Sequence, residues 1–366
     1  MERKSDDPNA ADHSGDKPEA KAPVKAPVKG RGMFIGSFLL VALVGTGVYF
    51  GVAANTNGQS RSNQNSNRNA LTLDQIPFDG QAAFQWIERV CALGPRPSGS
   101  EAMKKQQQLL AQHFTQLGGK VEMQQFAVRH PLNGSRVPMA NLIVRWHPDR
   151  KERILFCAHY DTRPFPDRDP VNPKGIFLGA NDGGSGVGVL AELGRHMPAF
   201  DSKLGVDFVL FDGEEFVFDR KDRYFLGSEW FARSYAADAT KTYKYRAAVL
   251  LDMVGDQFLD LYKERNGAIH WRDSRWIVKT IWDKAAELGV TEFIDRPWDK
   301  EILDDHIMLH QYGKIPACDI IDFKYRSRDN RIDYWHTQED TPDKCSALSL
   351  AKVGWVIHEW LKDQGK

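Results

Sequence analysis

The sequence predicts an α/β fold in which a mostly parallel β-sheet is covered by helices on both faces, preceded by one transmembrane helix. Short runs rich in β-branched or large apolar residues, typical of buried strands, alternate with longer segments of helical apolar spacing. The strand-like runs are 142–146, 153–157, 206–211, 247–251 and 317–321, and the helical segments are 82–93, 101–117, 186–196, 274–288 and 347–362. This alternation is typical of a sheet between two layers of helices, which makes a three-layer sandwich.

The composition favours one large domain whose function comes from a local site. The chain has 366 residues, of which 42% are hydrophobic, enough to bury a sizeable core. Its formal net charge is zero, so no excess of charge indicates a nucleic acid as partner. The cysteines are too few for a disulfide scaffold, and two of them fall in expected buried strands as small apolar residues; the four are Cys91, Cys157, Cys318 and Cys345.

The first 70 residues differ in composition from the rest of the chain. Residues 1–32 contain almost no large apolar side chain, which predicts a disordered tail. Residues 33–54 are uncharged and match the ~20 residues that a membrane span needs. The polar linker 55–70 is much less basic than the tail, which by the positive-inside rule puts the tail in the cytoplasm. The basic residues before the span are Lys21, Lys25, Lys29 and Arg31.

The predicted span is a single-pass membrane anchor. Residues 71–366 then form one folded domain on the extracytoplasmic side, either periplasmic or extracellular. The alternative is a cleavable signal peptide, because residues 52–54 (VAA) form an acceptable cleavage site. The long basic leader and the long apolar run favour the uncleaved anchor.

Ionisable residues gather directly after the predicted strands. The carboxyl ends of parallel strands meet at one edge of a sheet, where ligands bind in folds of this class. Acids beside apolar strands cost several kcal/mol to desolvate unless they are paired or bind a metal. The residues at this edge are His159 and Asp161, Asp212, Glu214 and Glu215, Asp252, and Trp335 and His336.

Three of the candidate residues form a suitable set of metal ligands. Zinc accepts carboxylate and imidazole ligands and leaves a position open when it is catalytic, so Asp182, Glu215 and His336 would make an open three-ligand site. Cobalt or manganese could occupy the same ligands. Asp182 lies in the glycine-rich segment 177–190, whose glycines allow a tight turn and a close approach of the backbone to an ion. The segment has neither the dinucleotide-binding nor the phosphate-loop spacing.

Five motifs in the chain resemble the zinc aminopeptidase (M28) superfamily. They are 93–100 (LGPRPSGS), 158–161 (AHYD), 179–188 (GANDGGSGVG), 211–215 (FDGEE) and 251–255 (LDMVG). The resemblance covers about 80–362 and implies an α/β sandwich with a central mixed sheet.

Within that superfamily the chain looks most similar to the glutaminyl-peptide cyclotransferases. Such enzymes use one zinc ion to convert the N-terminal glutamine of a peptide or protein to pyroglutamate, with release of ammonia. The features that carry this resemblance are Arg163-Pro164, the segments 167–170 (DRDP), 304–306 (DDH) and 318–322 (CDIID), Tyr334-Trp335-His336-Thr337 and 340–343 (DTPD).

The resemblance implies a role for each matching residue. Asp182, Glu215 and His336 match the zinc ligands, Glu214 matches the catalytic acid/base, Asp304 and Asp252 match carboxylates of a hydrogen-bond network, and Trp335 matches an indole of the substrate pocket. Cyclisation needs no water, because the peptide's own α-amine attacks the side-chain carbonyl at high effective molarity. Glu214 would take the amine proton and return it to the departing ammonia.

The alternative reading is a two-zinc aminopeptidase that hydrolyses N-terminal residues from peptides. Resemblance to that branch would enlist His159 and Asp252 as further ligands, with Asp182 bridging two ions. These residues are present, so the ligand inventory leaves both readings open. A third reading, a membrane-tethered binding domain without metal, predicts a lost ligand or a lost Glu214, and none is missing.

Two positions favour the cyclotransferase, and one position and one segment depart from the cyclotransferase pattern. The hydrolase branch usually has a smaller residue than Asp304 at that place, and usually lacks a tryptophan such as Trp335 beside the last ligand. By contrast, Leu303 stands where the animal cyclotransferases carry a polar amide, and residues 216–220 lack the tryptophan that they place there.

Overall fold

The computed structural model describes residues 71–324 and 333–366. The predicted tail, membrane span and linker, residues 1–70, lie outside these ranges, so they stay predictions. Among the helices of the described residues, none combines the length and the hydropathy that a membrane crossing requires.

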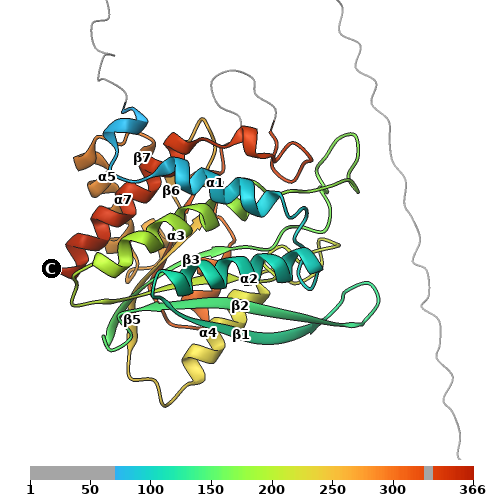
Figure 1. Ribbon diagram of the computed structural model, residues 1–366, viewed down its shortest axis with the longest axis horizontal. Helices are drawn as coiled ribbons and strands as arrows, with labels where there is room; N and C mark the ends of the chain where they lie inside the picture. The colour runs from blue at the N-terminus through green and yellow to red at the C-terminus, as the bar shows by residue number, and fades with distance from the viewer. Residues whose placement is uncertain (1–70, 325–332) are drawn as a thin grey trace, which may run out of the picture. The chain divides into compact units, whose positions relative to one another are not determined.

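The central sheet has six strands and is mixed, which confirms the α/β class (Figure 1). The edge strand β1 is antiparallel to β2, and β2 is antiparallel to β4, whereas β4, β3, β5 and β8 are mutually parallel. In spatial order the strands are β1 (Lys120–Arg129), β2 (Arg136–Trp146), β4 (Gly205–Phe211), β3 (Glu152–His159), β5 (Lys244–Asp252) and β8 (Ala317–Ile321). The five predicted strands are all present in this sheet.

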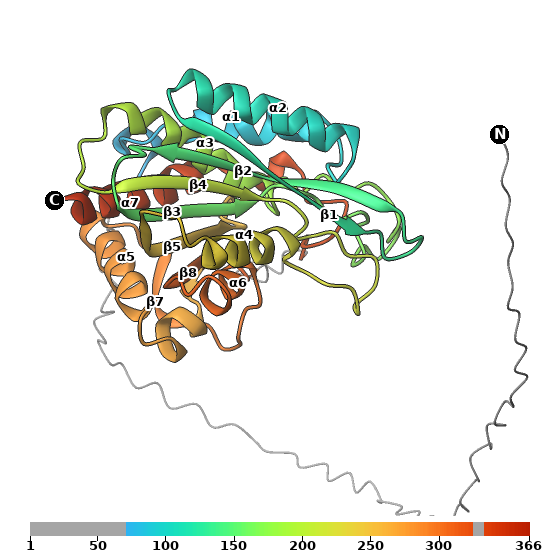
Figure 2. The same cartoon turned by 90° about the horizontal axis from the view of Figure 1, so that it is seen from below.

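Successive strand residues point to two different cores, as the pleat of a strand requires. In β3, Phe156 packs into the larger core and Cys157 into the smaller one. Figure 2 shows α1, α2 and α3 on one side of the sheet and α4 and α6 on the other. The larger core is completed by α1 (Gly80–Cys91), α2 (Glu101–Gln116), α3 (Gly184–His196), α5 (Arg275–Leu288) and α7 (Ala347–Gly365), and the smaller by α4 (Leu226–Ala237) and α6 (Asp305–Gln311).

Several elements were not predicted, because each has a weak pattern. Strand β1 is mostly half-exposed and carries few large apolar residues. Helix α6 has seven residues, too few for two full helical repeats. The remaining elements that were not predicted are helix α4, a two-stranded parallel sheet of β6 (Leu261–Lys263) and β7 (Phe293–Pro297), a π-helical turn at Asn266–His270, and short 3-10 helices at Leu73–Gln75, Met197–Ala199 and Pro342–Lys344.

The glycine-rich segment has two separate structural roles. Gly183 caps α3 with a φ of 83°, in the left-handed region that favours glycine, and this turn follows Asp182 directly. Further along the helix, a Cβ atom on Gly186 would lie 2.3 Å from the carbonyl oxygen of Leu251, and one on Gly188 would lie 2.6 Å from that of Ala83. Gly183 therefore forms the tight turn beside Asp182, as expected. Gly186 and Gly188 let α3 pack closely between β5 and α1.

The four cysteines are buried and unpaired. Cys157 and Cys318 lie in β3 and β8 as small apolar residues, which confirms the prediction for both. The structure thus relies on core packing rather than on a disulfide in this domain.

Candidate metal centre

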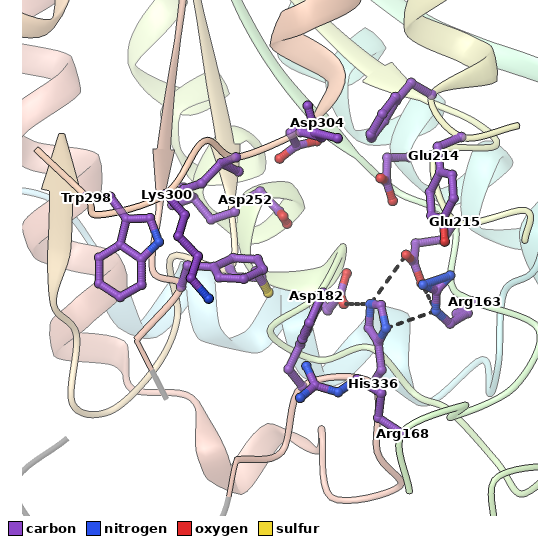
Figure 3. A pocket seen from close by; sticks show the side chains of 18 of the residues that line it. Arg163, Arg168, Asp182, Glu214, Glu215, Asp252, Trp298, Lys300, Asp304 and His336 are labelled. Carbon is purple, nitrogen blue, oxygen red and sulfur yellow. Dashed lines mark hydrogen bonds and ion pairs between the residues drawn. The ribbon is translucent and has the colours of Figure 1, made fainter. Parts of the chain in front are cut away.

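The predicted site residues come together at the carboxyl ends of the parallel strands. His159 and Asp252 are the last residues of β3 and β5, and Glu214 and Glu215 follow β4. Asp182 precedes α3, and His336 lies in the loop between β8 and α7, with its backbone at a φ of 56°. The resulting constellation is shown in Figure 3.

Asp182, Glu215 and His336 present converging ligand atoms. His336 Nε2 lies 3.4 Å from Asp182 Oδ2 and 3.5 Å from Glu215 Oε1, and the three side chains are buried. The ligand atoms all lie within 4.8 Å of one another. Two buried carboxylates and an imidazole facing one point are the donors that zinc accepts, so the residues fit the expected ion.

A second group of possible ligands shares Asp182 with the first. His159 Nε2 lies 3.1 Å from Asp182 Oδ1 and 3.1 Å from Asp252 Oδ1, so these three atoms also lie close enough to hold an ion. The same distances suit hydrogen bonding of a protonated His159, because burial opposes its charge while Asp252 raises the pKa of the imidazole well above its usual value. The geometry therefore accommodates one ion or two.

Two further aspartates accept hydrogen bonds from the backbone at the expected metal ligands Asp182 and Glu215. Asp161 accepts the N–H groups of Glu214 and Glu215, each at 3.1 Å. Asp340 accepts those of Asn181 at 2.8 Å and Asp182 at 3.1 Å. Asp161 was expected at this edge of the sheet without a specific role, and Asp340 lies in the quoted segment 340–343.

Glu214, Asp252 and Asp304 form a cluster of carboxyl groups beside the ligands, and Figure 3 shows all three around the same cavity. Burial raises the pKa of Glu214 well above its usual value, and the neighbouring charges of Glu215 and Asp304 raise it further. Burial and then Asp252 raise the pKa of Asp304 to about 7. Burial also raises the pKa of Asp252. A carboxyl group with a pKa of about 7, as at Asp304, exchanges its proton near neutral pH, as acid–base catalysis requires.

Asp304 is held at the N-terminus of α6 with more acids behind it. Its Oδ1 caps the helix by accepting the Asp305 N–H at 2.6 Å. Asp305 in turn accepts the Ser228 hydroxyl at 2.5 Å, and burial raises the pKa of the Asp305 carboxyl. Asp319, which lies on β8, is also fully buried, and burial raises the pKa of its carboxyl group as well. Asp305 and Asp319 lie in the quoted segments 304–306 and 318–322, but no local pattern distinguishes them as site residues.

The site opens into a cavity of about 710 Å³. Trp335 lies at this cavity, with its ring 4.8 Å from that of Phe323 and the guanidinium of Arg168 4.4 Å above it. The exposed Leu303 and the half-buried Trp298 also line the cavity, so its walls combine aromatic and aliphatic surfaces. The predicted pocket role of Trp335 is consistent with this position, and Trp298 and Phe323 add to the aromatic surface.

Comparison with protein families gives one match. The model of peptidase family M28 matches residues 141–361, more than half of the chain. Among curated proteins, an uncharacterized protein of Saccharomyces cerevisiae, YFR018C, is 29% identical over 183 residues, which are 44% of this chain and 46% of that protein. The match thus spans about half the length of that relative.

Comparison with solved structures gives longer matches. Glutaminyl cyclase of Fimbriiglobus ruber is 39% identical with a TM-score of 0.72, covering 78% of this chain and 96% of its own. Glutaminyl cyclase of Porphyromonas gingivalis is 31% identical with a TM-score of 0.72, covering 79% and 99%. A Zn-dependent exopeptidase of Parabacteroides distasonis is 30% identical with a TM-score of 0.69, covering 77% and 97%.

Proposed function

This chain belongs to peptidase family M28, and we propose that within it the protein is a zinc-dependent glutaminyl-peptide cyclotransferase. The observation that carries the proposal is the buried carboxyl of Asp304, which shares a cavity with Glu214 and Asp252 and has its pKa raised to about 7. Such a cluster can store and relay a proton in a site where no water is consumed. The similarity to two bacterial glutaminyl cyclases supports the same conclusion.

Asp182, Glu215 and His336 would hold the zinc ion. When bound, the ion supplies Lewis acidity that polarises the side-chain carbonyl of the substrate's N-terminal glutamine. Trp335 and the apolar walls of the cavity would hold the glutamine side chain and exclude water from it.

Glu214 would move the proton that the reaction has to transfer. The neutral α-amine forms a bond to the side-chain carbonyl carbon, and Glu214 accepts the proton that this nitrogen gives up. The same proton then goes to the side-chain nitrogen as its bond to carbon breaks, which releases ammonia. Asp304 helps to keep the Glu214 pKa high, because two neighbouring carboxyl groups resist carrying charge together.

A two-zinc aminopeptidase is the second candidate. The group of His159, Asp182 and Asp252 favours it, since these ligand atoms also lie within reach of one ion. The similarity to a Zn-dependent exopeptidase supports this candidate too. In that case Glu214 would deprotonate a water molecule rather than an amine.

Incubation of the purified protein with a Gln-initiated and a Leu-initiated peptide tests the proposal. We expect mass spectrometry to find that the Gln peptide loses the mass of one ammonia while the Leu peptide stays intact. Metal counting on the same sample should give about one zinc ion per chain. Free leucine together with about two zinc ions per chain would overturn the proposal in favour of the aminopeptidase.

We also propose that residues 33–54 anchor the protein in a membrane, with the catalytic domain and its Gln-initiated peptide or protein substrates on the extracytoplasmic side. The uncharged stretch and its basic flank support this topology. Protease added to cells that have been stripped of any outer membrane and wall, with the plasma membrane intact, is expected to reach the 71–366 domain while an epitope within residues 1–32 stays protected. Recovery of the intact domain from the growth medium, or protection of both parts, would contradict it.

A further inference from the structure

The loop after β3 contacts the His336 turn through its backbone. The Arg168 N–H donates to the carbonyl oxygen of His336 at 3.1 Å. Two residues after His336, the N–H of Gln338 donates to Asp169 Oδ2 at 2.9 Å. His336 itself has a φ of 56°, a conformation that costs energy in a non-glycine residue and persists when its surroundings hold it. The loop therefore constrains the backbone on which this ligand is carried.

Side chains of the same loop surround the other ring nitrogen of His336. Nδ1 lies 3.3 Å from Asp167 Oδ1 and 3.1 Å from Arg163 Nε. Arg163 Nε is also 3.0 Å from Asp167 Oδ1 and 3.3 Å from Glu215 Oε2. The guanidinium of Arg163 is buried, whereas the Asp167 side chain is 54% exposed. One cation and one carboxylate thus contact two of the three expected ligands, and Figure 3 shows the cation, Arg163, beside His336 and Glu215.

The position of the proton on the His336 ring determines how these contacts act on the ligand. A neutral imidazole that offers Nε2 to a metal carries its proton on Nδ1, and that proton needs an acceptor. Asp167 Oδ1 is the carboxylate oxygen in reach, and accepting this proton fixes the ring orientation and makes Nε2 a stronger donor. The Arg163 Nε–H is directed at Nδ1 in the structure, at 3.1 Å, so in that state it has to turn to the carboxylates of Asp167 and Glu215, whose oxygens lie 3.0 and 3.3 Å from Nε. The charge of the guanidinium favours the ionised form of both carboxylates.

We propose that Asp167 and Arg163 are a positioning pair for the metal centre, in which Asp167 orients His336 and Arg163 joins Asp167 to Glu215. The inference rests on the metal centre of the proposed cyclotransferase, but it applies equally to a hydrolase with these ligands. The pair couples ligands from two distant segments, because Glu215 follows β4 and His336 follows β8 while the pair itself follows β3.

The substitution Asp167→Asn in the full chain tests the proposal. We expect the zinc dissociation constant, measured by competition with a chromogenic chelator, to rise about 10–100-fold. The melting temperature of the metal-free protein should stay unchanged, because the side chain is half-exposed, and its increase on adding zinc should shrink. The conservative Asp167→Glu should recover part of the affinity, since it restores a carboxylate.

Glu122→Gln is the matched control. Glu122 is 52% exposed and pairs with Arg145 at 2.5 Å on β1 and β2, away from the metal ligands, so its loss should leave zinc affinity unchanged. An Asp167→Asn variant with wild-type zinc affinity would overturn the proposal, as would an equal loss of affinity in Glu122→Gln. Zinc affinity is read without substrate, so failure to form pyroglutamate would count against the proposed function and not against this pair.

Discussion

Replacing Glu214 with glutamine is expected to lower kcat for pyroglutamate formation about 10²–10⁴-fold, the range for loss of a general acid–base group. The amide has the size of the carboxyl group but cannot accept the proton of the attacking amine. The wild-type carboxyl is suited to this transfer, because burial and then the charge of Glu215 raise its pKa well above the ordinary range. Steady-state kinetics with a Gln-initiated peptide, together with zinc counting, measures the effect.

Glu215→Gln provides the comparison for this experiment. The two glutamates are adjacent, and the backbone N–H groups of both are held by Asp161. Glu214→Gln should therefore keep its zinc ion, whereas Glu215→Gln removes an expected ligand and should lose most of it. A Glu214→Gln variant that retains wild-type kcat would refute the assigned role.

Asp182→Asn is expected to abolish zinc binding and reduce activity to background. Asp182 is the residue common to both groups of ligands, and burial opposes its charge while His159 and His336 lower its pKa. An asparagine offers one neutral oxygen in place of an ionised carboxylate, so an ion at either place loses its strongest electrostatic contact. Metal analysis after dialysis against dilute zinc, with a peptide assay on the same sample, checks this outcome.

The number of zinc ions bound by the Asp252→Asn variant distinguishes a one-ion site from a two-ion site. Asp252 lies within ligand distance only in the group with His159 and Asp182. In the proposed cyclotransferase its loss leaves about one zinc ion per chain, as in the wild type. A fall from about two ions to about one would show that the second group binds metal, which favours the aminopeptidase.

The sequence by itself determined the α/β class and most of the site's chemistry. The five runs that became β2, β3, β4, β5 and β8 are strongly apolar, so their pattern was readable without a structure. Glu214, Glu215 and Asp252 lie at or just after the ends of those strands, and parallel strands bring such positions to one edge, so they could be selected before their geometry was known. Asp182 and His336 lie farther along the loops after β3 and β8, and they were selected by their ligand chemistry and by the resemblance.

Short or half-exposed elements could not be predicted in the same way. Strand β1 is held by its pairing with β2, and the seven-residue helix α6 is capped by Asp304. Their stability comes from partners elsewhere in the chain, which local propensity does not describe.

Only the tertiary structure decided how the site residues are held. The bond between the Gln338 N–H and Asp169 joins residues 169 positions apart, and the bond between Asp340 and the Asp182 backbone spans 158. No local pattern encodes such pairings, because they depend on which loops the sheet order brings together. The ligands and the acid–base group could therefore be predicted from the sequence. The residues that orient them, Asp161, Asp340, Arg163 and Asp167, could be identified only from the tertiary structure, because a hydrogen bond requires both atoms within about 3 Å.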